Sequence, residues 1–470
     1  MKDPMMLRYC ALAMAALAIW LLPTDAMAQE FTPCSDADAF PALAGSLCAT
    51  AEVPLQPGVS ASPDETLSLF VRKFPAANAR KRRGQVWLVA GGPGESGASL
   101  YPVLPTLRQA FAGYDLIFPD HRGTGYSSKL CPDQEAPGSA GGIALAGEEW
   151  GPCIGALHGN VARTHSFTIT NAAYDLAALI RRYRSRGKVQ LYGVSYGTQL
   201  VLRMMQVAPV RLDGMILDGL VPPETASEWD LSRRTAVVDA VGRQLLNADQ
   251  TQQYRELLAQ QQPGWLASVP GGDLRRLMGS MLTFPEVRDR IPQMIEALAN
   301  NDSAPLISAI SDVRALSAQL SVYPQSPPSL PLVMLISGSE NNARPDLTAD
   351  IVAAESGDSL FTSSLPGLLV GSPTPLYQRD AFYGTVPQRL PRTLVVHGTL
   401  DPNTPYEGAL AHIRLLAPAG DVHFVTVDRG AHFLALVAPT CFAGTVSAFV
   451  SRAAVAANCA EIALPDEQAP

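Results

Sequence analysis

The sequence predicts an α/β fold with a mostly parallel central sheet, helices on both faces and a helical insertion. Short aliphatic and β-branched runs alternate with longer stretches of helical periodicity, which is typical of parallel strands joined by crossover helices. These runs are apolar throughout, as expected for a sheet buried between two helical layers. The expected strands are 86–90, 115–118, 189–192, 214–217, 393–396 and 422–425.

Two helices are expected around the third strand. Residues 171–183 carry apolar side chains at helical spacing, and Thr170 is the predicted N-cap. A second helix is expected over 199–207, ending before Pro209. Both would cover the strand that lies between them in the sequence.

The stretch 222–391 has a different character. Helical patterns, among them 236–246 and 252–258, alternate there with Pro-rich and Ser-rich connections, and strand signals are weak. We therefore expect a helical cap inserted into an α/β core. The expected core consists of residues 29–221 and 392–470.

The N-terminus has the layout of a secretory signal peptide. Lys2 and Arg8 precede the apolar run 11–22, and Ala26-Met27-Ala28 follows as a cleavage site. A membrane anchor is the alternative, but the run is short for the ~30 Å of a bilayer core. We expect residues 1–28 to be removed and the mature chain to be periplasmic or extracellular, with no membrane span.

Cysteine usage agrees with export. Of seven cysteines one falls within the predicted signal peptide, and the remaining even number favours disulfides in an exported chain. Proximity in sequence favours the pairs Cys34–Cys48, Cys131–Cys153 and Cys441–Cys459. No cluster has zinc-ligand spacing, so no metal is expected. The net charge of −8 argues against a nucleic-acid partner.

A candidate nucleophile lies in Gly193-Val194-Ser195-Tyr196-Gly197, the only G-x-S-x-G in the chain. The motif directly follows an expected strand and precedes an expected helix. In that setting the serine occupies a tight turn that exposes its Oγ atom. Small residues at 193 and 197 are needed because the turn brings backbone close to backbone. Ser195 is the predicted nucleophile.

A serine hydroxyl needs a general base. His432 is the best placed of the seven histidines, in a loop after the last expected strand. The alternative is a plain surface-loop histidine. His423 lies within a strand and is interpreted as structural, and His397, at the end of another strand, is a weaker rival.

The base in turn needs a carboxylate that holds its tautomer. Asp401 directly follows the strand 393–396 and gives the order serine, aspartate, histidine along the chain. Asp428 is the competitor, but it precedes the turn that carries His432. Asp401 is the predicted acid.

A tetrahedral intermediate also needs donors for its oxyanion. The run Gly91-Gly92-Pro93-Gly94 follows the first expected strand and can present bare backbone N–H groups, although such a run can also be a simple turn. The predicted donors are the N–H groups of Gly92 and Tyr196. The resulting two-step acyl transfer requires no cofactor.

Four separated segments resemble the prolyl iminopeptidase and tripeptidyl-aminopeptidase-like serine peptidases. They are Gly91-Gly92-Pro93-Gly94-Glu95-Ser96-Gly97, Asp120-His121-Arg122-Gly123-Thr124-Gly125-Tyr126-Ser127, Gly193-Val194-Ser195-Tyr196-Gly197 and Gly398-Thr399-Leu400-Asp401-Pro402-Asn403-Thr404-Pro405. The resemblance spans most of the mature chain and is weakest between 222 and 391. It implies an α/β-hydrolase fold and an aminopeptidase with a helical cap over its site.

The resemblance also suggests one substrate-binding residue. In relatives, glutamates of the cap hold the α-ammonium group of the substrate, and the segment Ile336-Ser337-Gly338-Ser339-Glu340 is similar to such a cap segment. Glu340 is the implied ammonium ligand, with an exposed loop glutamate as the alternative. Gly338 stands where relatives have cysteine. Asp120 and Arg122 are interpreted as scaffolding.

Two other functions remain open at this point. The same fold and triad serve esterases and other small-molecule hydrolases, so the expected partner is a peptide or a small acyl substrate. A binding protein without catalysis is the third possibility, against which the complete set Ser195, Asp401 and His432 argues. Oligomeric state is not predicted.

Overall fold

The computed structural model describes residues 30–57, 65–140, 145, 147–261 and 263–461. The predicted signal peptide, 1–28, lies outside these residues. Among the described helices, none combines the length and the hydropathy that a membrane span needs.

One sheet organises the described chain, in the order β1-β2-β3-β5-β4-β6-β7-β8-β9-β10. The pairs from β5 to β10 are parallel, whereas β1, β2 and β3 are attached by antiparallel pairing. The strands are β1 Thr32–Pro33, β2 Leu47–Pro54, β3 Thr66–Phe74, β4 Gly84–Val89, β5 Tyr114–Pro119, β6 Lys188–Val194, β7 Gly214–Asp218, β8 Thr393–Gly398, β9 Val422–Asp428 and β10 Asn458–Ala460. The predicted mostly parallel α/β sheet is confirmed.

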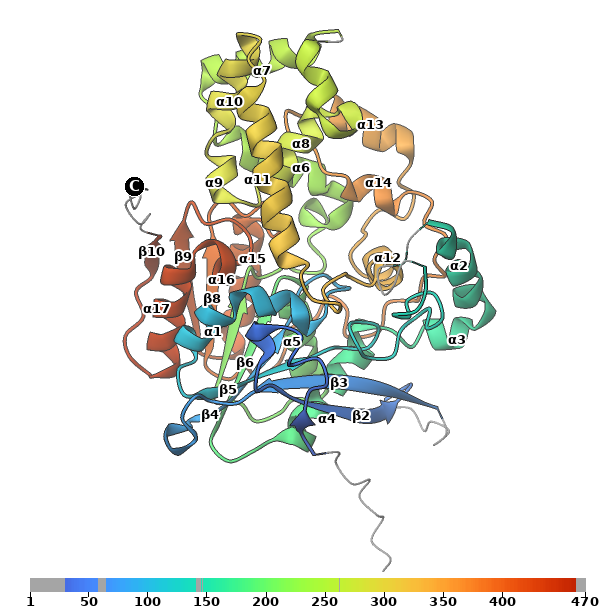
Figure 1. Cartoon of the computed structure of the whole chain (residues 1–470), viewed down its shortest axis with the longest axis vertical. Helices are drawn as coiled ribbons and strands as arrows, with labels where there is room; N and C mark the ends of the chain where they lie inside the picture. Colours follow the sequence, from blue (N-terminus) through green and yellow to red (C-terminus); the bar gives the residue numbers. More distant parts are fainter. Residues whose placement is uncertain (1–29, 58–64, 141–144, 146, 262, 462–470) are drawn as a thin grey trace, which may run out of the picture.

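Both faces of the sheet are covered by helices (Figure 1). One apolar core packs under α4 (Ile169–Tyr183), α5 (Tyr196–Val207) and α15 (Tyr406–Leu416). The other packs under α1 (Leu104–Ala110), α16 (Leu434–Val437) and α17 (Pro439–Val450). The carboxyl ends of the parallel strands therefore meet at one edge, where ligands of such sheets bind.

Two expected helix starts are corrected by the structure. Thr168, not Thr170, caps α4, because its hydroxyl accepts a hydrogen bond from the N–H of Asn171 at 3.0 Å. The hydroxyl of Thr170 instead accepts from Arg203 Nη1 at 2.7 Å inside the core. The helix α5 starts at Tyr196, earlier than the predicted residue 199.

Only helices occur between β7 and β8 in the described residues. Their bounds are α6 Arg234–Arg243, α7 Ala248–Ala259, α8 Leu274–Met281, α9 Pro285–Arg288, α10 Ile291–Ala299, α11 Ala304–Leu320, α12 Leu330–Ser339, α13 Ala349–Gly357 and α14 Leu365–Leu369. Those from α6 to α11 pack around a third apolar core and, in Figure 1, stand above the sheet, whereas α12 packs against the first core. Two more helices, α2 Trp150–Gly159 and α3 Val161–Thr164, precede α4. The assignment of 222–391 as a cap domain remains a prediction.

The disulfides pair as proximity in the sequence predicts. Cys34–Cys48 joins the residue directly after β1 to β2, and Cys131–Cys153 joins a loop to α2. Cys441–Cys459 joins α17 to the edge strand β10. Each bridge closes a loop of modest length. In the chain-entropy model a bridge that closes a loop of this size contributes roughly 3 kcal/mol to the free energy of unfolding.

Candidate active site

Ser195 occupies a turn between β6 and α5 that forces an unusual backbone. Its φ of 55° and ψ of −127° are strained for a residue with a side chain. The turn is tight: a Cβ added at Gly193 would lie 2.6 Å from the carbonyl oxygen of Gly197, and one added at Gly197 would lie 2.6 Å from the carbonyl oxygen of Ala90. Glycine is therefore required at both places.

His432 and Asp401 meet across two loops. His432 Nδ1 lies 2.8 Å from Asp401 Oδ2, which leaves Nε2 free for proton transfer. Asp401 also accepts hydrogen bonds from the N–H groups of Asn403 and Thr404, both at 2.8 Å, and from the Thr404 hydroxyl at 2.8 Å. The carboxylate is thus fixed in place by its own loop.

Electrostatics favour an imidazolium at this position. Burial disfavours the charged form, but the Asp401 carboxylate outweighs it and raises the pKa of His432. Burial would also raise the pKa of Asp401, yet His432 and the loop donors hold that pKa well below its usual range. The pair therefore stabilises the ionised acid beside a protonated base.

The rival residues lie in other environments. His397 is fully buried; its Nε2 lies 2.8 Å from the Thr404 carbonyl and its Nδ1 accepts from the Leu220 N–H at 3.1 Å. His423 is half-exposed beside Asp421, and Asp428 is exposed at the end of β9. Among the histidines considered, His432 is the one that Asp401 binds at 2.8 Å.

Ser195 and His432 face a common pocket of about 310 Å³. Gly92 and Tyr196, the predicted oxyanion donors, line it too. The glycine loop approaches the nucleophile closely, because a Cβ added at Gly91 would lie 3.2 Å from the Ser195 Cβ. The structure thus gathers every predicted site residue around this pocket, with Asp401 behind His432.

Glu340 lies at the C-terminal end of α12, lines the same pocket and is only 3% exposed, so it is not the exposed loop glutamate of the alternative reading. Tyr377 donates to its Oε1 at 2.7 Å, and Arg203 donates to its Oε2 at 3.1 Å. Burial raises the pKa of Glu340; Arg203 opposes that shift, and Glu224 adds to it.

Glu224 and Arg203 were not predicted. Glu224 accepts hydrogen bonds from Arg203 at 2.7 Å, from Gln199 at 2.8 Å and from the N–H of Gly384 at 2.7 Å. A sequence signal existed for both residues. Arg203 interrupts the apolar face of a predicted helix, and Glu224 follows closely on a predicted strand at the carboxyl edge of the sheet.

Two further carboxylates organise the loops. Asp218, at the end of β7, accepts from the N–H groups of Leu434 and Ala435 and from the Tyr192 hydroxyl, which fixes the chain just after His432. Asp120 accepts from the N–H of Gly97 at 2.9 Å and so holds the end of the glycine loop. Burial raises the pKa of each carboxyl to about 6.

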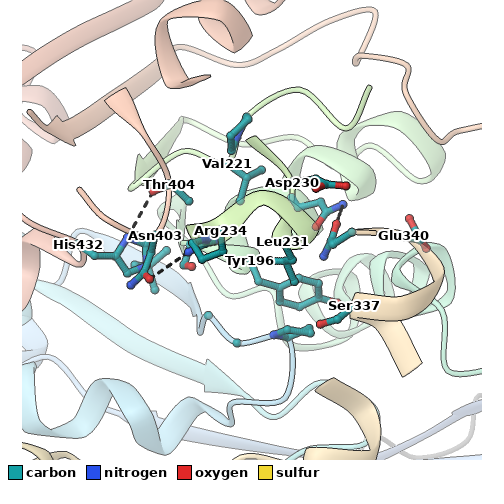
Figure 2. A pocket seen from close by; sticks show the side chains of 18 of the residues that line it. Tyr196, Val221, Asp230, Leu231, Arg234, Ser337, Glu340, Asn403, Thr404 and His432 are labelled. Atoms are coloured by element: carbon teal, nitrogen blue, oxygen red, sulfur yellow. Dashed lines mark hydrogen bonds between the residues drawn. The ribbon is translucent and has the colours of Figure 1, made fainter. Parts of the chain in front are cut away.

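Arg234 also lines the pocket and was not predicted. It opens α6 and, in Figure 2, lies beside Asn403 and between His432 and Glu340. No pattern in the sequence marks Arg234, since Arg233-Arg234 resembles any solvated basic pair.

Comparison with known proteins places this geometry in a family. The model of the alpha/beta hydrolase fold family matches residues 86–439. The serine protease Hip1 of Mycobacterium tuberculosis and that of Mycobacterium bovis are 29% identical over 216 residues, 41% of this chain and 40% of each relative. The match thus spans less than half the length of these curated relatives.

Similar solved structures include an esterase from Thermogutta terrifontis, 17% identical with a TM-score of 0.38, covering 86% of this chain and 98% of the esterase. A bromoperoxidase from Bacillus anthracis is 15% identical with a TM-score of 0.38, covering 86% of this chain and 100% of that chain. Because the family model matches most of the sequence, from the first parallel strand to the start of α17, the chain belongs to the alpha/beta hydrolase fold family.

Proposed function

We propose that the protein is a serine hydrolase in which Ser195 attacks a carbonyl carbon while His432 takes its proton. Asp401 holds the imidazole and stabilises the imidazolium, and the N–H groups of Gly92 and Tyr196 bind the oxyanion. His432 then protonates the leaving group, and water releases the acyl group by the reverse sequence.

Within that class we propose an aminopeptidase that cleaves peptides near a free N-terminus. The observation that carries this proposal is the charge around Arg203. Glu224 and Glu340 contact its guanidinium at 2.7 and 3.1 Å, and Asp380 lies 3.7 Å away. Three carboxylates surround one cation, so this end of the pocket carries excess negative charge.

An α-ammonium group would balance that charge. Glu224 and Glu340 both line the pocket that contains Ser195. An ammonium held there would lie in the same pocket as the nucleophile, and in an aminopeptidase that ammonium is carried by the acylating part of the substrate. The resemblance to the prolyl iminopeptidase and tripeptidyl-aminopeptidase-like peptidases supports the same assignment, as does a relative that is named a serine protease. An uncharged N-terminus would leave the carboxylates uncompensated.

The test compares a free peptide with its N-acetylated form, in the wild type and in Glu340→Gln and Glu224→Gln. We expect kcat/KM on the free peptide to exceed that on the acetylated peptide by at least about a hundredfold, because a desolvated charge pair contributes strongly to recognition. Each substitution should reduce the preference by about tenfold or more.

Glu256→Gln, at an exposed position of the cap helix α7, is the matched control and should keep the preference. Equal rates on free and acetylated peptides would contradict the aminopeptidase proposal. Turnover of simple esters with no turnover of either peptide would instead establish an esterase.

We further propose that the chain is exported after cleavage behind Ala28. Three disulfides among the described residues support this, because such bonds persist in oxidising compartments. Mass spectrometry of the exported protein would then find Gln29 as its first residue, and a retained N-terminal segment would contradict the proposal.

A further inference from the structure

Arg234 is a buried cation with no ion-pair partner among the residues that the structure describes. It is 7% exposed, and its one hydrogen bond among the described residues runs from Nη1 to the side-chain oxygen of Asn403 at 3.0 Å. Its Nε is buried with no partner in the described chain. A guanidinium offers five N–H donors in a fixed fork, so most of its capacity is unused.

The other buried arginines of the described chain are different. Each has a carboxylate at 2.7 to 2.9 Å: the pairs are Arg72–Asp36, Arg122–Asp175, Arg203–Glu224 and Arg288–Asp289. No described carboxylate comes within ion-pair distance of Arg234. Burial lowers its pKa to about 10, and the more distant Asp401 and Asp230 oppose that shift without contacting it. A buried charge of this kind calls for an anionic ligand.

The place of Arg234 indicates which part of a substrate it would meet. It lines the pocket of Ser195 and His432 and is bound to Asn403, whose N–H in turn binds Asp401. Its charge is near enough to His432 to disfavour the imidazolium. Because His432 must protonate the leaving amine, the leaving group occupies the His432 side of the pocket.

The acidic end of the pocket lies elsewhere. Figure 2 shows Glu340 on the far side of the view from His432 and Asn403, with Arg234 between them and next to Asn403. The pocket therefore has two poles of opposite sign. The acidic pole suits an ammonium on the acylating part, and the basic pole suits an anion on the leaving part.

We propose that Arg234 binds a carboxylate on the leaving group, so that the preferred substrates are short peptides with a free C-terminus just beyond the scissile bond. This inference rests on the proposed aminopeptidase function and names its substrate class. The same chemistry could come from the α-carboxylate of the leaving residue or from an acidic side chain. In either case the carboxylate would form a paired hydrogen bond with the guanidinium fork.

The experiment measures kcat/KM for three peptides that share an N-terminal alanine: Ala-Ala with a free carboxylate, Ala-Ala amide and Ala-Asp amide. We expect wild type to prefer the free acid over the amide by at least about tenfold, since a buried donor left unpaired rejects the uncharged analogue. High activity on Ala-Asp amide would identify a side-chain carboxylate as an accepted source, and low activity would restrict the site to the C-terminus.

Substitution then assigns the preference to a residue. In Arg234→Gln the ratio of acid to amide should fall to about one, mainly through KM, whereas Arg234→Lys should keep part of it. Arg233→Gln, its half-exposed neighbour, should keep the full ratio. If Arg234→Gln does not fold, its rates on the free acid and on the amide fall equally. The ratio of acid to amide in the wild type then remains the test.

A wild-type ratio near one, or a ratio that survives in folded Arg234→Gln, would overturn the inference. If no free-amine peptide were turned over, the aminopeptidase proposal would fail by itself. Arg234 would then be tested with two esters of one acyl group, whose leaving alcohols differ only by a carboxylate. A preference for the carboxylate ester that Arg234→Gln removes supports the assignment, and its absence overturns it.

Discussion

His432 is held from both sides by carboxylates of different strands. Asp401, beyond β8, binds its Nδ1 at 2.8 Å. Asp218, at the end of β7, binds the N–H groups of Leu434 and Ala435 and so anchors the loop on which the imidazole sits. Asp401 is the main cause of the raised pKa of His432; Asp218 adds to that shift and fixes the backbone that follows the imidazole.

A pH profile separates these roles. The base must be neutral to take the serine proton, so activity rises as pH increases through the pKa of His432. Because Asp401 raises that pKa, the acidic limb of wild-type kcat/KM should lie at a higher pH than the titration of an ordinary histidine. In Asp401→Asn the limb should move to lower pH, and kcat should fall by about 10⁴-fold as the tautomer is lost.

Asp428→Asn is the matched control, because that exposed carboxylate lies on the same strand-to-loop segment as His432. It should change neither the limb nor kcat. An unchanged limb in Asp401→Asn would show that another group acts on the base.

The triad candidates, with the loop donors Gly92 and Tyr196, could be named from the sequence, because each follows directly on a strand and parallel strands bring such positions to one edge. For Arg203 and Glu224 the sequence marks an unusual position but not a role, and for Arg234 it marks neither. Their roles depend on which charges contact each other after folding: Arg203 lies near three carboxylates, whereas Arg234 has none at ion-pair distance in the described part of the chain. The sequence shows which residues are charged but not which of them contact each other in the folded chain.

At the scale of elements, the turn between β6 and α5 depends on its neighbour β4. Gly197 packs against the carbonyl oxygens of Val89 and Ala90, directly before the glycine loop. A side chain at 197 would push the nucleophile turn away from that loop. The positions of β4, the nucleophile turn and the glycine loop therefore depend on one another.

Gly197→Ala should lower the free energy of unfolding by about 1–3 kcal/mol, as overpacking against rigid backbone does. It should also lower kcat/KM, because the oxyanion donors and Ser195 would separate. Denaturant titration and kinetics on one sample check both effects. Gly155→Ala in α2, where an added Cβ meets nothing within 4 Å, should be neutral or stabilising. Unchanged stability and activity in Gly197→Ala would contradict the account of this turn.

The parallel strands β4 to β9 were predictable from their unbroken apolar runs, whereas the antiparallel strands and the short parallel strand β10 were not. In β2 buried residues such as Ala49, Ala51 and Val53 alternate with Thr50 and Glu52, which are less buried. One face of such a strand is solvated, so it lacks the continuous hydrophobicity that marks a strand buried on both faces. Edge strands β1 and β10 are too short to leave a pattern.

At the scale of the whole molecule, the helices between β7 and β8 complete a pocket that the sheet edge alone would leave open. The core contributes Ser195 and His432, whereas Arg234 and Glu340 come from α6 and the end of α12. This division explains why the proposed chemistry was easier to predict than the substrate: the proposed catalytic residues follow strand ends, whereas Arg234 and Glu340, two of the charges proposed to select a substrate, come from the inserted helices.

The proposed activation of Ser195 by His432 can be measured by treating the protein with a fluorophosphonate and locating the adduct by peptide mapping. We expect one adduct, on Ser195, in the wild type. In folded His432→Gln the same adduct should form at a rate lower by several orders of magnitude. An unmodified Ser195, or equal rates of labelling in the two proteins, would contradict the proposed activation.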